Sequence, residues 1–204
     1  MMNHLEIEVK FYLTNIDIIR NHILQIAGQS VDGKIFETNI RFEDKNKTLK
    51  KKKCLLRLRK DKRTTLTFKS PPTVSNPNFK ILKELEVEVN DFSTMCLIIE
   101  SLGFHQEQKY EKWRETFILN DTMICLDILP FGNFIEIEGS EENIKKLSSE
   151  LGLEWKEKIL FNYLELFELI KKKMNLLFSD VTFDNFKNIY SKDLSSIFID
   201  MLSH

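Results

Sequence analysis

Glycine and proline are scarce in this sequence, with six and four residues among 204. Irregular connections rely on these residue types, so we expect short loops or loops built from Asn, Asp and Lys. The three cysteines lack a CxxC spacing and the four histidines are scattered, which excludes a readable disulfide framework or histidine zinc site. Apolar runs stay well below the roughly 18 residues of a membrane-spanning helix, and the charged N-terminus does not resemble a signal peptide. These absences predict a cytoplasmic protein with no membrane partner.

An excess of charge of one sign is also missing, because 30 basic residues face 31 acidic ones for a net charge of −1. Such a balance gives no global field for nucleic acid, so a positive site for an anion must be local. The lysine run Lys50–Lys53 can be interpreted as a nucleic-acid patch or as a solvated hairpin. The net charge favours the hairpin, and we expect no nucleic-acid partner.

What the sequence does contain is a set of short segments in which apolar and charged residues alternate strictly. This period of two predicts β-strands with one apolar and one charged face. A weaker alternation predicts a further strand over Ile35–Phe42. The clearer strands cover Leu5–Leu13, Leu55–Arg59, Thr64–Lys69, Leu82–Val89, Lys112–Leu119, Met123–Leu129 and Phe134–Gly139.

Helical spacing of apolar residues separates these strands and follows them. It predicts helices over Asp17–Ala27, Asp91–Leu102, Glu141–Leu151 and Glu157–Met174, and an amphipathic helical tail over Leu176–His204. We therefore divide the chain into a main domain, residues 1–173, and a C-terminal helical extension, residues 174–204. The apolar stripe of the extension is expected to dock on the main domain or on a second copy of the chain, which would give a homodimer.

The charged strand faces are sorted by sign. Some carry only carboxylates, as in EIE, ELEVE and the later EIE, whereas LLRLR and KWR carry only basic residues. Paired carboxylates suit a hard divalent cation, and paired Arg and Lys suit phosphate, so a metal with a polyphosphate satisfies both sets. If about eight strands close into a barrel, the charged face can line its lumen while helices cover the apolar outside. The fold class is thus α+β, a closed antiparallel eight-stranded β-barrel tunnel with helices packed outside and a C-terminal helical tail.

The ordered motifs resemble the CYTH superfamily, the triphosphate tunnel metalloenzymes. EIEVK at Glu6–Lys10 is similar to the ExExK signature of that family, and LLRLR, LTFKSP, ELEVEV, KWRETF, ICLDILPFGNFIEIEG and NYLEL follow in family order over about residues 1–172. Three positions depart from the pattern, namely Ser70, Phe117 and Asn162, and none of them removes a charged position.

The resemblance implies roles for particular side chains. A divalent cation, Mg²⁺ or Mn²⁺, is expected on Glu6, Glu8, Glu86, Glu88, Asp127, Glu136 and Glu138. A small-molecule triphosphate is expected on Lys10, Arg41, Arg57, Arg59, Lys69, Lys112, Arg114 and Lys158. Of these residues, Lys10, Lys112, Arg114 and Asp127 are expected to take part in catalysis.

Two chemistries fit the same implied tunnel. A class IV adenylate cyclase converts ATP to cyclic AMP and pyrophosphate, and we favour this activity slightly on the LDILPFGNFIEIEG segment. A triphosphatase instead hydrolyses tripolyphosphate, thiamine triphosphate or a nucleoside triphosphate. The third possibility is a module that binds polyphosphate or nucleotide without catalysis.

Overall fold

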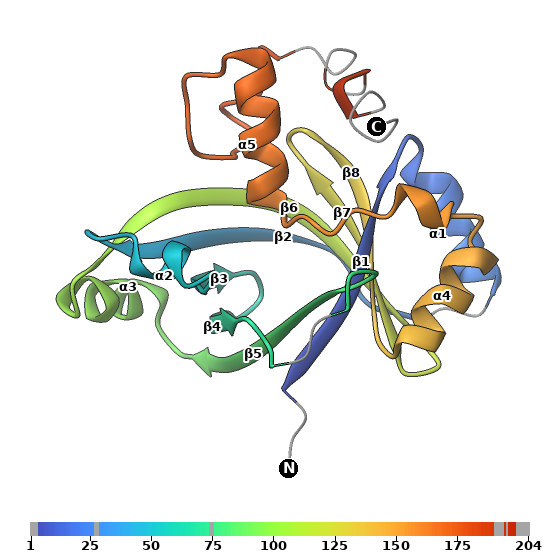
Figure 1. Ribbon diagram of the computed structural model, residues 1–204, viewed down its shortest axis with the longest axis horizontal. Coiled ribbons are helices and arrows are strands. Elements are labelled where there is room, and N and C mark those ends of the chain that lie inside the picture. The colour runs from blue at the N-terminus through green and yellow to red at the C-terminus, as the bar shows by residue number, and fades with distance from the viewer. Residues whose placement is uncertain (1–3, 27–28, 74–75, 190–193, 195, 199–204) are drawn as a thin grey trace.

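Eight strands close into an antiparallel barrel in the order β1-β5-β4-β3-β2-β6-β7-β8 (Figure 1). The computed structural model describes residues 4–26, 29–73, 76–189, 194 and 196–198. The predicted closed eight-stranded barrel with helices outside is confirmed. Its strands are β1 (Leu5–Leu13), β2 (Gln29–Asp44), β3 (Leu55–Lys60), β4 (Thr64–Ser70), β5 (Lys80–Val89), β6 (Phe104–Leu119), β7 (Thr122–Leu129) and β8 (Gly132–Glu138).

Strands β2 and β6 are much longer than their sequence patterns predict. Each has 16 residues, and they pair with one another along most of this length. The register shifts between Ser30 and Lys34 and again between Arg41 and Phe42, so the alternation of apolar and polar residues is interrupted there. Sequence periodicity therefore detected the central part of β2, Ile35–Phe42, and only the C-terminal half of β6, Lys112–Leu119.

Side-chain caps determine where three of the helices begin. Asn15, Asp91 and Ser140 accept backbone N–H groups at the starts of α1 (Ile16–Gln25), α3 (Phe92–Ser101) and α4 (Glu141–Glu150). Gly103 and Gly152 follow α3 and α4 with φ of 94° and 71°, a left-handed conformation that glycine adopts without steric cost. The short helix α2 (Thr48–Lys51) contains part of the lysine run, whose side chains are exposed.

Apolar side chains of the strands point outward and are covered by these helices. Helices α1 and α4 lie together on one side of the barrel (Figure 1), where Ile23 and Ile144 join a buried cluster with Val9, Phe11 and Ile137. On another side, α3 covers β2 and β3 through a second apolar cluster. Because the apolar faces of the strands pack against helices on the outside of the barrel, the charged faces of the strands line its lumen.

The helix predicted over Glu157–Met174 begins later than expected. A short 3-10 helix, η1 (Trp155–Glu157), is followed by extended backbone in which the Ile159 N–H donates to the Lys10 carbonyl at 2.7 Å. Helix α5 (Tyr163–Met174) then starts with a capping box in which Asn162 and Glu165 satisfy each other's backbone N–H groups. The pairing with β1 and this cap therefore prevent a helix before residue 163, although the spacing of the apolar residues there is helical.

The prediction of a continuous helix over the tail is wrong for residues 176–189. Here Val181 pairs with β6, its N–H donating to the Lys109 carbonyl at 2.8 Å and its carbonyl accepting from the Glu111 N–H at 2.9 Å. Strand β7 pairs with β6 only from Trp113 to Leu119, so this part of the β6 edge is available to the tail. Residues 194 and 196–198 are helical, and residues 190–193, 195 and 199–204 lie outside the described residues.

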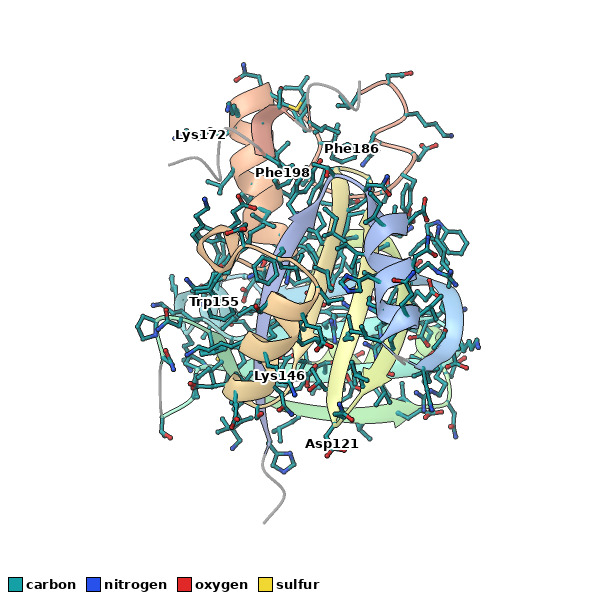
Figure 2. The ribbon with its side chains drawn as sticks, turned by 90° about the vertical axis from the view of Figure 1, so that its right-hand side faces the viewer. Asp121, Lys146, Trp155, Lys172, Phe186 and Phe198 are labelled. Carbon is teal, nitrogen blue, oxygen red and sulfur yellow. The ribbon has the colours of Figure 1, made fainter. Side chains whose placement is uncertain are left out.

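Where it is described, the tail packs on the barrel. Val181, Phe186 and Phe198 are buried in one cluster with Phe134 of β8 and Phe167 of α5. Figure 2 shows Phe186 and Phe198 beside α5, above the ends of the strands. Docking of the tail on the main domain is confirmed for these residues, and the homodimer stays a prediction.

Candidate functional site in the barrel lumen

The lumen is lined by the charged faces of the strands, as their alternation predicts. Lys10 pairs directly with Glu136 across β1 and β8, Arg57 with Arg41 across β3 and β2, and Arg114 with Asp127 across β6 and β7. Directly opposed residues share one face of a sheet, so these side chains meet inside the barrel. The structure thus brings the sequence-predicted lumen residues together from separate strands.

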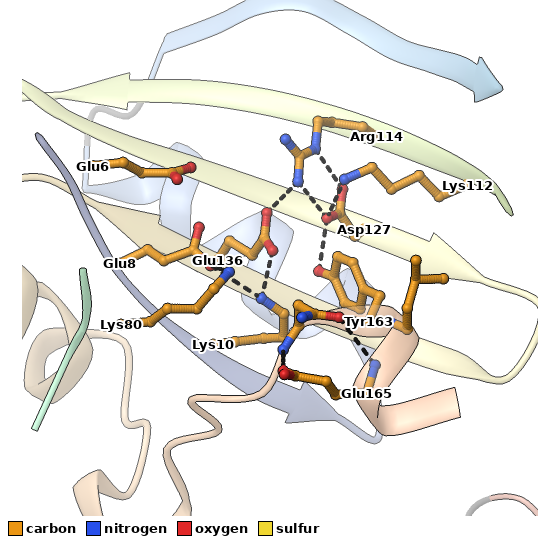
Figure 3. A network of polar contacts seen from close by, with 12 residues as sticks. Glu6, Glu8, Lys10, Lys80, Lys112, Arg114, Asp127, Glu136, Tyr163 and Glu165 are labelled. Carbon is orange, nitrogen blue, oxygen red and sulfur yellow. Dashed lines mark hydrogen bonds and ion pairs between the residues drawn. The ribbon is translucent and has the colours of Figure 1, made fainter. Parts of the chain in front are cut away.

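One part of the lumen, which we call the paired wall, consists of Lys10, Lys112, Arg114, Asp127 and Glu136 (Figure 3). Asp127 is 0% exposed and accepts from Lys112 Nζ at 2.9 Å and from Arg114 Nε at 2.7 Å. Glu136 accepts from Lys10 Nζ at 2.5 Å and also from Arg114. Every charged group of the paired wall therefore has an oppositely charged partner in close contact, although its three cations outnumber its two carboxylates.

Burial and neighbouring cations shape the acidity of this wall. Although burial opposes ionisation, Lys10 and Arg114 hold the pKa of Glu136 well below its usual value. Glu37 of β2 lies against Lys112 and Arg114, which lower its pKa to about 2 against the effect of burial. Glu136 and Glu37 are thus ionised at neutral pH.

Tyr163, the first residue of α5, closes the paired wall from one end (Figure 3). Its hydroxyl donates to Asp127 Oδ2 at 2.7 Å, and its ring centroid lies 4.4 Å from Lys10 Nζ and 5.2 Å from Lys112 Nζ. Burial and the adjacent Asp127 raise the pKa of Tyr163 well above its usual value, so the hydroxyl stays a donor. The ring adds cation–π contact to two ammonium groups.

A second region, the carboxylate group, consists of Glu6, Glu8 and Glu138. Lys69 Nζ lies 2.5 Å from Glu6, and Lys80 Nζ lies 2.6 Å from Glu8. Lys80 and Lys10 lower the pKa of Glu8 to about 2 despite its burial. Burial and the nearby Glu6 and Glu8 raise the pKa of Glu138 to about 7, and burial and Glu8 also raise the pKa of Glu6. The three carboxylates therefore carry more negative charge than the two lysines neutralise.

A third region, the arginine wall, consists of Arg41, Arg57 and Arg59 on β2 and β3. The ion pairs of these guanidiniums are long, from 3.3 Å for Arg59 to Asp61 up to 4.0 Å for Arg41 to Glu43. Their Nε atoms are buried without a hydrogen-bond partner among the described residues. Buried N–H groups are almost always satisfied in folded proteins, so the Nε donors of Arg41 and Arg57 are available for a ligand, whereas that of Arg59 already lies 3.3 Å from Asp61 Oδ2.

The remaining expected ligands are placed differently. Glu86 lies 3.4 Å from Arg59 and Glu88 lies 3.4 Å from Arg63, with side chains 39% and 56% exposed. The structure thus places both beside arginines at the rim rather than in the carboxylate group.

Lys158 lies outside the lumen cluster. Its Nζ is 5.3 Å from the ring centroid of Trp155, which itself packs against Phe11 and Phe79 on the outer face of the barrel. The structure therefore does not bring Lys158 together with the other residues expected to bind the triphosphate.

Several lumen residues were absent from the sequence-based site. The two-residue alternation along the predicted strand Ile35–Phe42 could have identified Glu37 and Asn39, because both lie on the same face of that strand as Arg41. Lys80 precedes the predicted start of β5, and Tyr110 precedes the predicted start of β6, so no sequence signal placed them. Tyr163 lies in the NYLEL motif but carries no charge.

Within the described parts of the chain, no three acidic, histidine or cysteine side chains converge as a preformed metal site. Across those same residues, the helices are too short or too polar to cross a membrane.

The comparison with known families identifies the fold. The CYTH domain model matches residues 4–183. The chain belongs to the CYTH domain family. No protein of curated function matches the sequence.

Solved structures support the same assignment. A Vibrio parahaemolyticus protein described as a candidate adenylate cyclase superposes with a TM-score of 0.73 at 20% identity, covering 81% of this chain and 98% of its own. A Pyrococcus horikoshii OT3 protein has a TM-score of 0.67 at 26% identity, covering 79% and 98%. A Hippeastrum protein described as a candidate adenylyl cyclase with a dominant triphosphatase activity has a TM-score of 0.58 at 18% identity, covering 80% and 95%.

Proposed function

We propose that the protein is a divalent-metal-dependent enzyme that acts on a triphosphate held in the barrel lumen. The observation that carries this proposal is the arginine wall, where buried Nε donors of Arg41, Arg57 and Arg59 have no hydrogen-bond partner among the described residues. Guanidinium groups with available donors match phosphate oxygens in charge and geometry. A chain of phosphates is the small ligand that can engage three of them at once.

The carboxylate group fits a hard divalent cation. Glu6, Glu8 and Glu138 supply oxygen donors. Burial, together with the charges of Glu6 and Glu8, raises the pKa of Glu138 to about 7, and a bound cation would offset this negative charge. Bound Mg²⁺ or Mn²⁺ would polarise the attacked phosphoryl group and stabilise the departing oxygen. Lys69 and Lys80, which pair with Glu6 and Glu8, would then be released to the phosphates.

The protein's own residues orient the substrate. The arginine wall grips phosphate oxygens by charge-assisted hydrogen bonds and thereby aligns the phosphate chain along the lumen. In the paired wall, Lys112 and Arg114 hold the Asp127 carboxylate in place by hydrogen bonds, while Lys10 does the same for Glu136. These buried pairs form a rigid set of charges that need little reorganisation when the phosphoryl group reacts.

Hydrolysis of the terminal phosphate is the reaction that this lumen supports best, because its charged side chains match a polyphosphate rather than an organic group. Water would attack the terminal phosphorus, the bridging P–O bond would break, and a diphosphate would leave. The activity named for the Hippeastrum neighbour favours the same choice. Cyclisation of ATP, which the sequence slightly favoured, is the second candidate, supported by the name of the Vibrio neighbour.

A substrate panel tests the proposal. Tripolyphosphate, thiamine triphosphate and ATP are incubated with the protein and Mg²⁺ or Mn²⁺, and the products are separated by HPLC and ³¹P NMR. We expect orthophosphate and the diphosphate product from tripolyphosphate. Cyclic AMP with pyrophosphate from ATP would instead establish the cyclase. Tight binding of tripolyphosphate without turnover of any compound would establish the non-catalytic binder and contradict the enzyme.

A further inference from the structure

Asn39 is a neutral residue at the centre of the arginine wall. It lies on β2 with 0% exposure, and it shares the lumen face with Arg41. The strand register sets it opposite Arg59 of β3 on one side and opposite Tyr110 of β6 on the other. Its side chain is therefore surrounded by lumen residues and shielded from solvent.

Neither amide atom of Asn39 has a hydrogen-bond partner within the described residues. Glu37 Oε2, on the same face of β2, is also buried without a hydrogen-bond partner among the described residues, whereas Thr67 and Gln108 are satisfied. Thr67, also 0% exposed, donates to Glu86 at 2.9 Å and accepts from Arg57 at 3.1 Å, and Gln108 donates to the Ser179 carbonyl at 2.7 Å. An unsatisfied buried amide destabilises the fold, so its position is explained by a partner that the free protein does not supply.

The surroundings of Asn39 indicate the chemistry of that partner. The Nε atoms of Arg41, Arg57 and Arg59 are buried without hydrogen-bond partners in the same described region of β2 and β3. Four side chains at neighbouring register positions of β2 and β3 thus have N–H donors without hydrogen-bond partners, and three of them carry positive charge. An anion rich in acceptor oxygens satisfies these donors and offsets the charge of the three guanidiniums, whereas a cation does neither.

We propose that Asn39 is a substrate-binding residue whose Nδ2 donates to a phosphate oxygen held by the arginine wall. The proposal rests on the proposed function and deepens it, because it locates the phosphate chain along β2 and β3 before any metal binds. The paired wall, whose cations already contact Asp127 and Glu136, then contributes less to this first step of binding.

Calorimetric titration of tripolyphosphate in the presence of EDTA tests this inference. Asn39→Ala removes the amide donor, and we expect tripolyphosphate to bind about tenfold more weakly than to wild type. Asn39→Asp places a negative charge beside the anion, and we expect roughly a hundredfold loss. Asn78→Ala, at an exposed asparagine outside the lumen, serves as the matched control and should bind like wild type.

Thermal unfolding of the same variants separates binding from a structural role. Since Asn39 makes no hydrogen bond in the described structure, the midpoint for Asn39→Ala should equal or exceed that of wild type. Weaker binding together with an undiminished midpoint supports the proposal. Unchanged affinity of Asn39→Ala, or a lowered midpoint that accounts for weaker binding, overturns it.

The titrations are repeated with Mg²⁺ so that two failures remain distinguishable. Should wild type bind tripolyphosphate neither with EDTA nor with Mg²⁺, the proposed function itself fails. Should wild type and Asn39→Ala bind equally well in the condition where binding occurs, only the role of Asn39 is overturned.

Discussion

The paired wall and the arginine wall line one lumen, yet the charges of the two walls have different partners. In the paired wall, Asp127 and Glu136 hold their cations in short contacts, such as 2.9 Å from Lys112 to Asp127. In the arginine wall, the ion pairs of Arg57 with Glu84 and Glu86 are 3.9 Å and 3.8 Å long. A cation neutralised inside the protein supports the structure, whereas one with unused donors awaits a ligand.

The largest expected effect breaks the paired wall. Asp127→Asn removes the charge that Lys112 and Arg114 share and leaves two buried cations without it. We expect the free energy of unfolding to fall by about 3–5 kcal/mol, measured by urea denaturation in EDTA. Asp61→Asn, which removes the partner of Arg59 at 3.3 Å, is the matched change at the arginine wall and should cost about 1 kcal/mol or less. Equal losses in the two variants would show that the walls do not differ.

A smaller effect concerns pH and the carboxylate group. Glu138 has a pKa of about 7 in the folded protein against 4.5 as its ordinary value, so the folded state holds this proton more tightly than the unfolded state. Stability should therefore be greatest at low pH for this group and decline as the pH rises from about 4.5 to about 7. Glu138→Gln removes the decline and should stabilise the metal-free protein at pH 8 by an amount on the order of 2 kcal/mol.

Denaturation of both proteins at pH 5 and pH 8 measures this difference. Glu88→Gln changes a rim carboxylate whose side chain is 56% exposed, and it should leave the pH dependence as in wild type. A pH profile of Glu138→Gln that coincides with that of wild type would refute the assignment.

The smallest effect is expected outside the lumen. Lys158 lies over the Trp155 ring on the outer face, away from both walls. Lys158→Ala should therefore change kcat/KM for tripolyphosphate less than about twofold. A tenfold loss of kcat/KM in steady-state assays would contradict this and show that Lys158 contributes to the substrate site, as the family resemblance implies.

Much of the fold follows from strand phase alone. The alternation in EIEVK, LLRLR and FIEIE placed Glu8, Arg57 and Glu136 on lumen faces, and the structure agrees. Each of these segments is regular and half-buried, which is the condition under which a period of two is informative.

The remainder depends on contacts between distant segments. Val181 has the apolar neighbours of a helix, but its backbone pairs with the β6 edge that β7 leaves available. Likewise Tyr163 reaches Asp127 only because α5 starts after the Ile159 bridge to β1. The distances of the ion pairs also cannot be predicted from residue type. Arg57 and Arg114 are the same amino acid, yet the ion pair of Arg114 with Asp127 is short and those of Arg57 are long.

The division between the walls is tested most directly by Arg57→Met, measured for both turnover and stability. Arg57 donates one hydrogen bond at 3.1 Å to Thr67 and otherwise has long contacts, so the free energy of unfolding should change by only about 1 kcal/mol. Its kcat/KM for tripolyphosphate with Mn²⁺ should fall roughly a hundredfold, while Arg63→Met, at a rim side chain that is 69% exposed, keeps wild-type turnover. Wild-type turnover by Arg57→Met, or a loss explained by unfolding, would contradict the account.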